Sequence, residues 1–252
     1  MLKGSDFMPG IGTIVNVIAV IVGSLIGILL KKGLSERLQE SIMKALGVAA
    51  MFIGIGSTMA EMLYIGDDGS LGTQGVILMI VSLALGTLVG ELLKIEERLE
   101  GIGDRLKKFK LFSSSSRFTE GFVTATLVTS VGAMAIVGAL KDGLNGDPSI
   151  LFSKSILDFI STMIFASTLG IGVTCSALPM GIYQGVITLF AGVLGGFFSD
   201  AIISNVSLVG SVLIFCVGIN LFAGKRIKVG SMLPALLVPM IYGIITMYIL
   251  KA

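Results

Sequence analysis

The chain has 252 residues, of which 54% are hydrophobic and only 13% are charged, and its mean hydropathy is +0.99. A soluble domain has about 25% charged residues, so this composition leaves too little polar surface for a particle folded in water and predicts an integral membrane protein. The sequence contains no histidine, which excludes serine–histidine catalysis, histidine metal sites and histidine proton relays. It also lacks a nucleophile motif and a phosphate-binding loop, so we expect no enzyme, cofactor, metal or nucleic-acid partner.

Apolar segments bounded by charged or turn-forming residues recur along the chain, and most are about as long as the ~20 residues that a helix needs to cross the hydrocarbon. We therefore predict an all-α, multi-pass membrane protein with about eight transmembrane helices in a single polytopic domain. The predicted spans lie near residues 12–30, 41–61, 74–93, 119–140, 156–176, 181–198, 205–223 and 231–250.

Basic residues set the orientation of this arrangement. Fourteen of the 18 lysine and arginine residues lie on one side of an eight-span protein, in the loops after the first, third and seventh spans and at the start of the second. Loops rich in lysine and arginine stay in the cytoplasm. We therefore expect both termini to lie outside.

The stretch 95–117 is predicted to be a cytoplasmic amphipathic helix followed by a linker. Its apolar residues are spaced by three or four positions, which places them on one helical face, and basic residues follow. Such a helix can lie on the anionic inner leaflet. The alternative is a helical continuation of the third span that packs on a neighbouring loop.

The first predicted span aligns with the sixth without a gap, so that Asn16 corresponds to Gln184. Five spans separate the two copies, which therefore enter the membrane from opposite sides. This predicts a 3+2+3 inverted repeat, an arrangement found in secondary transporters. Its parts are a first repeat in residues 1–94, a central helix pair in 118–176 and an inverted repeat in 181–252.

Small residues spaced four positions apart recur in three of the spans. Such residues share one helical face and let two backbones approach closely, which drives helix association in lipid. We predict helix packing at these glycines, which are Gly23, Gly27, Gly86, Gly90 and Gly195.

Ionisable residues inside a span cost at least ~2.5–3.5 kcal/mol to insert and generally have a paired or functional role. Asp158 is the strongest candidate, and Lys154 lies four residues before it, where the two side chains can pair. Asp142 belongs to the same central pair of spans. The alternative is that Lys154 and Asp158 lie at the outer headgroup level and Asp142 in an exposed turn.

The remaining candidate polar residues inside the spans are uncharged, namely Asn16, Gln184 and Asn220. Each side chain can hydrogen-bond across helices, at a typical gain of ~1 kcal/mol. They are candidates for polar coordination of a substrate or ion, or for structural hydrogen bonds between helices.

Several motifs resemble a bacterial inner-membrane family of unknown function, the family called domain of unknown function 554. The motifs that carry the resemblance include 12–16 (GTIVN), 85–91 (LGTLVGE), 132–138 (GAMAIVG) and 165–172 (FASTLGIG). The resemblance extends over nearly the whole chain from Met8. It implies a multi-pass protein of the bacterial inner membrane and supplies no substrate.

Taken together, these features favour a secondary transporter that moves a small solute or ion by alternating access. Asp158, Lys154 and Asp142 would form its charged element, and the lipid bilayer would be its one certain partner. Two alternatives stay open. One is an ion channel. The other is a non-transporting scaffold, in which the glycine faces form a homo-oligomer and the basic helix recruits lipid or a partner.

Overall fold

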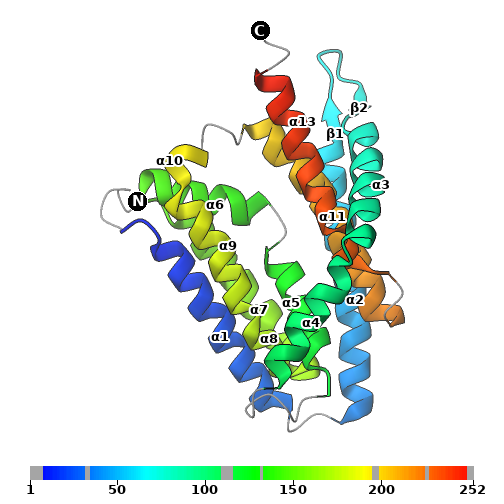
Figure 1. The fold of residues 1–252 in the computed structure, drawn as a ribbon, viewed down its shortest axis with the longest axis vertical. Helices are drawn as coiled ribbons and strands as arrows, with labels where there is room; N and C mark the ends of the chain where they lie inside the picture. Colours follow the sequence, from blue (N-terminus) through cyan, green and yellow to red (C-terminus); the bar gives the residue numbers. More distant parts are fainter. Residues whose placement is uncertain are drawn as a thin grey trace. The chain divides into compact units, whose positions relative to one another are not determined.

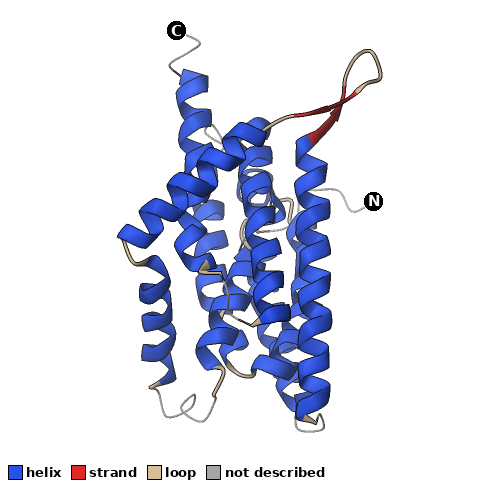
Figure 2. Ribbon diagram, turned by 90° about the vertical axis from the view of Figure 1, so that its right-hand side faces the viewer, coloured by secondary structure: helices blue, strands red, loops and turns tan. Residues whose placement is uncertain are grey.

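A computed structural model describes residues 8–31, 35–108, 116–130, 133–194, 199–224 and 227–248. In these ranges the chain is helical except for turns and one short hairpin, as Figure 2 shows. The prediction of an all-α membrane protein is therefore confirmed. The chain divides into two compact units, Met1–Met43 with Leu99–Gly196 and Lys44–Arg98 with Phe197–Ala252, called unit 1 and unit 2.

Helices long and apolar enough to cross a bilayer make up much of the described chain. Five helical segments meet this condition, and two further pairs of helices meet it together although they bend by 57° and 61°. These pairs are α3 (Val76–Leu92) with α4 (Ile95–Lys107), and α5 (Phe118–Ser130) with α6 (Ala133–Asn145). The structure thus supports five to seven spans in the described residues, and the count of eight stays a prediction.

Unit 1 is built around α1 and α7, which pack along each other and against shorter helices (Figure 1). Its remaining described helices include α5 and α6, which pack on α7 and on α9. The helices introduced here are α1 (Ile11–Lys31), α7 (Ser149–Leu169), α8 (Gly172–Cys175), α9 (Ala177–Leu189) and α10 (Ala191–Leu194).

Two glycines explain the close packing of α1 on α7. A Cβ atom at Gly23 would overlap the main-chain carbonyl oxygen of Phe159, and one at Gly27 would overlap that of Met163. Both glycines therefore face the backbone of α7 directly. The absence of a side chain at these positions lets two membrane helices come into backbone contact.

Unit 2 contains the hairpin and the helices that flank it in sequence. The hairpin strands β1 (Leu63–Ile65) and β2 (Leu71–Thr73) are antiparallel, with Tyr64 opposite Gly72. In the turn between them the Ser70 hydroxyl donates to Asp68, which lowers the pKa of that carboxyl group. The other elements are α11 (Asp200–Ala223), α12 (Val229–Met232), η1 (Leu233–Leu236) and α13 (Leu237–Tyr248), together with α3 and most of α2 (Glu36–Met62).

Glycines also determine how α3 packs in unit 2. A Cβ atom at Gly86 would overlap Ala235 of η1, and one at Gly90 would overlap the carbonyl oxygen of Ser231 in α12. Gly195, the fifth glycine of the predicted packing set, lies outside the described residues.

Several predicted boundaries differ from the observed helices. The fifth span was predicted over 156–176, but α7 covers Ser149–Leu169 and ends at Gly170, whose φ of 80° is unfavourable for other residues. The sixth was predicted over 181–198, but α9 has only 13 residues. The fourth, predicted as one span over 119–140, is the bent pair α5–α6.

Candidate functional site

Two charged side chains pair inside unit 1. Lys154 and Asp158 lie one helical turn apart on α7, and the Lys154 Nζ atom is 2.5 Å from the Asp158 Oδ2 atom. Each residue is only 6% exposed. Both side chains are therefore enclosed by their own unit, and the alternative that they lie at the outer headgroup level stays open. Pairing compensates for part of the free energy that is lost when the two charges leave water.

Asn16 of α1 joins this ion pair to a third helix. Its Nδ2 atom donates to Asp158 Oδ2 at 3.0 Å and to Gln184 Oε1 of α9 at 3.2 Å. Asn16 and Gln184 are fully buried. The acidic acceptor fixes the orientation of the Asn16 amide, since its oxygen would be repelled by the carboxylate. Four of the six predicted site residues are thus brought together, from α1, α7 and α9.

The site also has polar atoms that the protein does not satisfy. Among the described residues, neither Asn16 Oδ1 nor Gln184 Nε2 has a hydrogen-bond partner, and both atoms are buried. Buried polar atoms nearly always have a partner. One acceptor and one donor next to an ion pair therefore remain able to bind a small polar molecule or an ion.

Asp142 takes a different place from the one predicted. It is fully buried in α6, so the alternative of an exposed turn is wrong. Its Oδ2 atom accepts from the Gly12 main-chain N–H at 3.1 Å, in the first turn of α1. A carboxylate at this position satisfies a free amide and complements the positive end of the helix dipole. Asp142 therefore caps α1, and no described contact joins it to the Lys154–Asp158 pair.

Asn220 belongs to unit 2, and its side-chain amide bonds to the main chain of the same unit. Its Nδ2 atom donates to the Ile227 carbonyl oxygen at 2.7 Å, and its Oδ1 atom accepts from the Ile227 N–H at 2.9 Å. These paired bonds tie the end of α11 to the segment that leads into α12. Asn16 and Gln184 belong to unit 1, so a coordination site that they share with Asn220 stays a prediction.

The sequence analysis did not single out two threonines that extend the polar contacts of unit 1. The hydroxyl groups of Thr13 and Thr188 are 3.3 Å apart, and Thr188 donates to the Ala139 carbonyl oxygen at 3.2 Å. These bonds link α1, α9 and α6 beside the cap made by Asp142. The motif at 12–16 could have indicated Thr13, since this residue lies within one turn of Asn16 on the same helix.

These features define a helical membrane protein with a buried ion pair and an amide cluster inside one compact unit. The profile of the family described as "Protein of unknown function (DUF554)" matches residues 11–244, and the chain belongs to this family.

Two bacterial proteins of similar length resemble the chain. It is 34% identical over 228 residues to the "Uncharacterized membrane protein YdfK" of Bacillus subtilis (strain 168), which covers 90% of this chain and 93% of that protein. It is 32% identical over 237 residues to the "Uncharacterized protein YqgA" of Escherichia coli (strain K12), covering 91% and 94%. No solved structure matches the chain.

Proposed function

We propose that this protein is a secondary transporter that moves a small solute or ion across the bacterial inner membrane, with both termini outside. The observation that carries the proposal is the buried Lys154–Asp158 pair with Asn16 and Gln184 around it. In this proposal Asp158 and Lys154 bind or release the transported species, while the two amides coordinate it.

Energetics support a functional role for the pair. Replacing a buried ion pair by well-packed apolar residues is often neutral or stabilising, so stability alone gives little reason to keep lysine and aspartate here. Ionisable residues on membrane-spanning helices commonly mark substrate and ion pathways. The two unsatisfied amide atoms add binding capacity that a purely structural network would not leave unused.

The division of the chain into units also supports alternating access. In each predicted repeat the first helix, α1 or α9, belongs to unit 1 together with the central helices. The second and third helices of both predicted repeats belong to unit 2, apart from the first residues of α2. Two repeats that divide in the same way are consistent with inverted-repeat transporters, in which one set of helices moves against the other.

The glycine positions favour transport over a scaffold that oligomerises through glycine faces. Gly23, Gly27, Gly86 and Gly90 all lie in close contact with backbone or side chains of their own chain. These faces are therefore already occupied and are not available to a second copy. A channel would in addition need a continuous polar pore, whereas the ion pair lies enclosed in unit 1.

A thermal-shift screen of the detergent-purified protein tests the proposal. Inorganic ions, amino acids, organic acids and nucleosides are each added at high excess, since a ligand at a hundredfold excess over its Kd stabilises the folded form by ~2.7 kcal/mol. Each hit is then repeated with Asp158→Asn and with the matched control Asp68→Asn, which removes the same charge from an exposed turn of the hairpin.

The expected result is a ligand whose stabilisation disappears in Asp158→Asn and persists in Asp68→Asn. Proteoliposome uptake of that ligand should then require both Lys154 and Asp158. Equal uptake by wild type and by a folded Lys154→Gln/Asp158→Asn variant would exclude the pair from the transport pathway. Absence of uptake by wild type for every ligand that stabilises it would contradict the transporter and favour a scaffold.

A further inference from the structure

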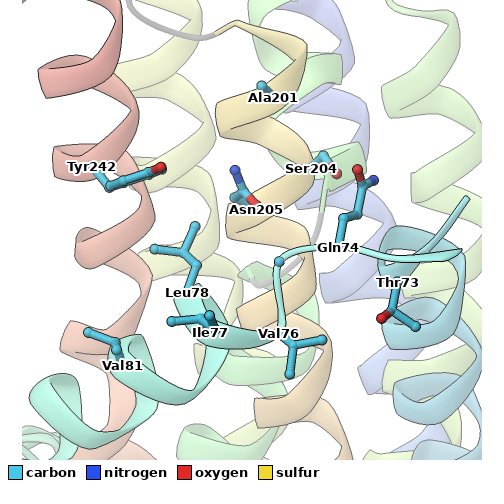
Figure 3. Close-up of a pocket in the computed structure, with 11 residues that line it drawn as sticks. Thr73, Gln74, Val76, Ile77, Leu78, Val81, Ala201, Ser204, Asn205 and Tyr242 are labelled. Atoms are coloured by element: carbon cyan, nitrogen blue, oxygen red, sulfur yellow. The ribbon is translucent and has the colours of Figure 1, made fainter. Parts of the chain in front are cut away.

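A groove of about 830 Å³ lies in unit 2, among the hairpin end, the first turns of α3, the N-terminal half of α11 and the middle of α13 (Figure 3). Small-molecule sites in proteins have volumes of roughly 300–1,000 Å³. The groove is separate from the ion pair, which belongs to unit 1, and its occupant does not depend on the proposed transport function.

The polar lining of this groove is uncharged. Among the described residues that line it there is no lysine, arginine, aspartate or glutamate. Most of its polar side chains, which are Gln74, Ser204, Asn205 and Tyr242, lie toward one part, where the Tyr242 hydroxyl points toward Asn205, whereas Thr73 lies apart from them (Figure 3). A bound anionic group would lose its hydration there without gaining an opposite charge.

Glu61 of α2 orients two of these side chains. The Ser204 hydroxyl donates to Glu61 Oε2 at 2.6 Å, and Gln74 Nε2 donates to the Glu61 carbonyl oxygen at 3.3 Å. The Ser204 oxygen and Gln74 Oε1 are thereby left as acceptors. These acceptor oxygens lie next to the Glu61 carboxylate. The arrangement disfavours a phosphate group and favours a ligand that donates hydrogen bonds, such as a hydroxyl group.

The rest of the lining is largely apolar, and part of it is exposed. Ile77 is 79% exposed and Val81 is 41% exposed, whereas Val76 and Leu78 are half-buried. In a membrane protein such side chains meet hydrocarbon rather than water. A molecule that fills the groove therefore combines a hydrogen-bond-donating head with an apolar chain.

We infer that this groove binds a lipid with a neutral, hydroxyl-bearing headgroup, such as a glycerol or sugar headgroup without phosphate. The headgroup hydroxyls donate to Ser204 and Gln74, Asn205 and Tyr242 provide further hydrogen bonds, and the acyl chain lies against Ile77 and Val81. A free polyol offers the same donors but lacks the apolar part that this wall accommodates.

Native mass spectrometry of the full-length protein, released from detergent, tests the inference. The probes are monoglucosyl-diacylglycerol, phosphatidylglycerol and phosphatidylethanolamine with identical acyl chains, each titrated alone and in competition. We expect one retained glucolipid, bound about tenfold more tightly than either phospholipid. Glucose and glycerol at millimolar concentration should not displace it.

Variants locate the binding site. The double substitution Ser204→Ala/Asn205→Leu should weaken glucolipid binding about tenfold, because it removes two hydrogen-bonding groups. The matched control is Thr87→Val, which removes a hydroxyl of α3 that is bonded within its own helix to the Leu83 carbonyl oxygen.

Three outcomes would overturn the inference. Wild-type protein could retain the phospholipids as tightly as the glucolipid, free sugar could displace the lipid, or the double variant could bind as the control does. The first two outcomes use only wild-type protein, so they decide the question even where the double variant does not fold.

Discussion

Asn16 and Asp158 are 142 positions apart in the sequence, and the Asn16 side-chain amide donates a 3.0 Å hydrogen bond to the Asp158 carboxylate. The acceptor oxygen is the same Oδ2 atom that binds Lys154. One carboxylate oxygen thus receives a hydrogen bond from its own helix and one from α1. This shared atom couples the charge state of α7 to the packing of α1.

Replacing Asn16 by leucine should destabilise the protein by about 1.5–3 kcal/mol, the range for a lost hydrogen bond to a charged group. Gln184→Leu should cost less, about 1 kcal/mol, because Gln184 accepts from a neutral amide. Thermal unfolding in detergent measures both. Equal losses of stability in the two variants would show that the charge of Asp158 does not strengthen its hydrogen bond with Asn16.

Lys154→Met leaves a buried carboxylate without its partner and should destabilise by about 3–5 kcal/mol. The double variant Lys154→Met/Asp158→Leu removes both charges and should recover most of that loss. Unfolding of Lys154→Met, of Asp158→Leu and of the double variant gives the coupling energy between the two residues.

The same double variant separates stability from activity. We expect it to fold and to show no uptake of any ligand found by the thermal-shift screen. Retained uptake would exclude the pair from the transport pathway, whatever its effect on stability.

Gly23→Ala introduces a methyl group that overlaps the Phe159 carbonyl oxygen and should destabilise by about 1–3 kcal/mol, as overpacking does. The matched control is Gly185→Ala in α9, where no other atom lies within 4 Å of the new Cβ. That substitution should be neutral or stabilise by up to about 1 kcal/mol, since alanine is the better helix former. Similar losses at both positions would contradict backbone contact between α1 and α7.

Asp142→Ala removes the cap of α1 and should destabilise by about 0.5–2 kcal/mol. The loss should be local, so hydrogen–deuterium exchange should speed up at the Gly12 amide and its neighbours. Asp142→Asn keeps an acceptor oxygen and should preserve most of the protection. Unchanged exchange in Asp142→Ala would show that the Gly12 N–H does not depend on this side chain.

The sequence predicted the class of fold because hydropathy depends on composition over a long window. It missed the start of α7 because Ser149, Ser153 and Lys154 look like loop residues to a hydropathy window. In the structure Lys154 is buried, and its charge is compensated by Asp158. A hydropathy scale assigns each residue type a fixed free energy of transfer and takes no account of pairing between two charged side chains.

The candidate site was predicted in part for a related reason. Spacing along one helix placed Lys154 beside Asp158, and the repeat alignment linked Asn16 with Gln184. Neither argument specifies which helices touch, so Asp142 was grouped with an ion pair to which no described bond joins it. Asp142 instead binds the main chain of α1, a partner that no side-chain pattern reveals.

The glycine contacts along α1 have a consequence for the proposed transport cycle. Direct contact of Gly23 and Gly27 with the α7 backbone opposes sliding of α1 along α7. We therefore expect the two helices to move as one rigid body, with the Asn16–Asp158 bond kept. Spin labels on the outer faces of α1 and α7 should report a single separation in every state that the protein visits.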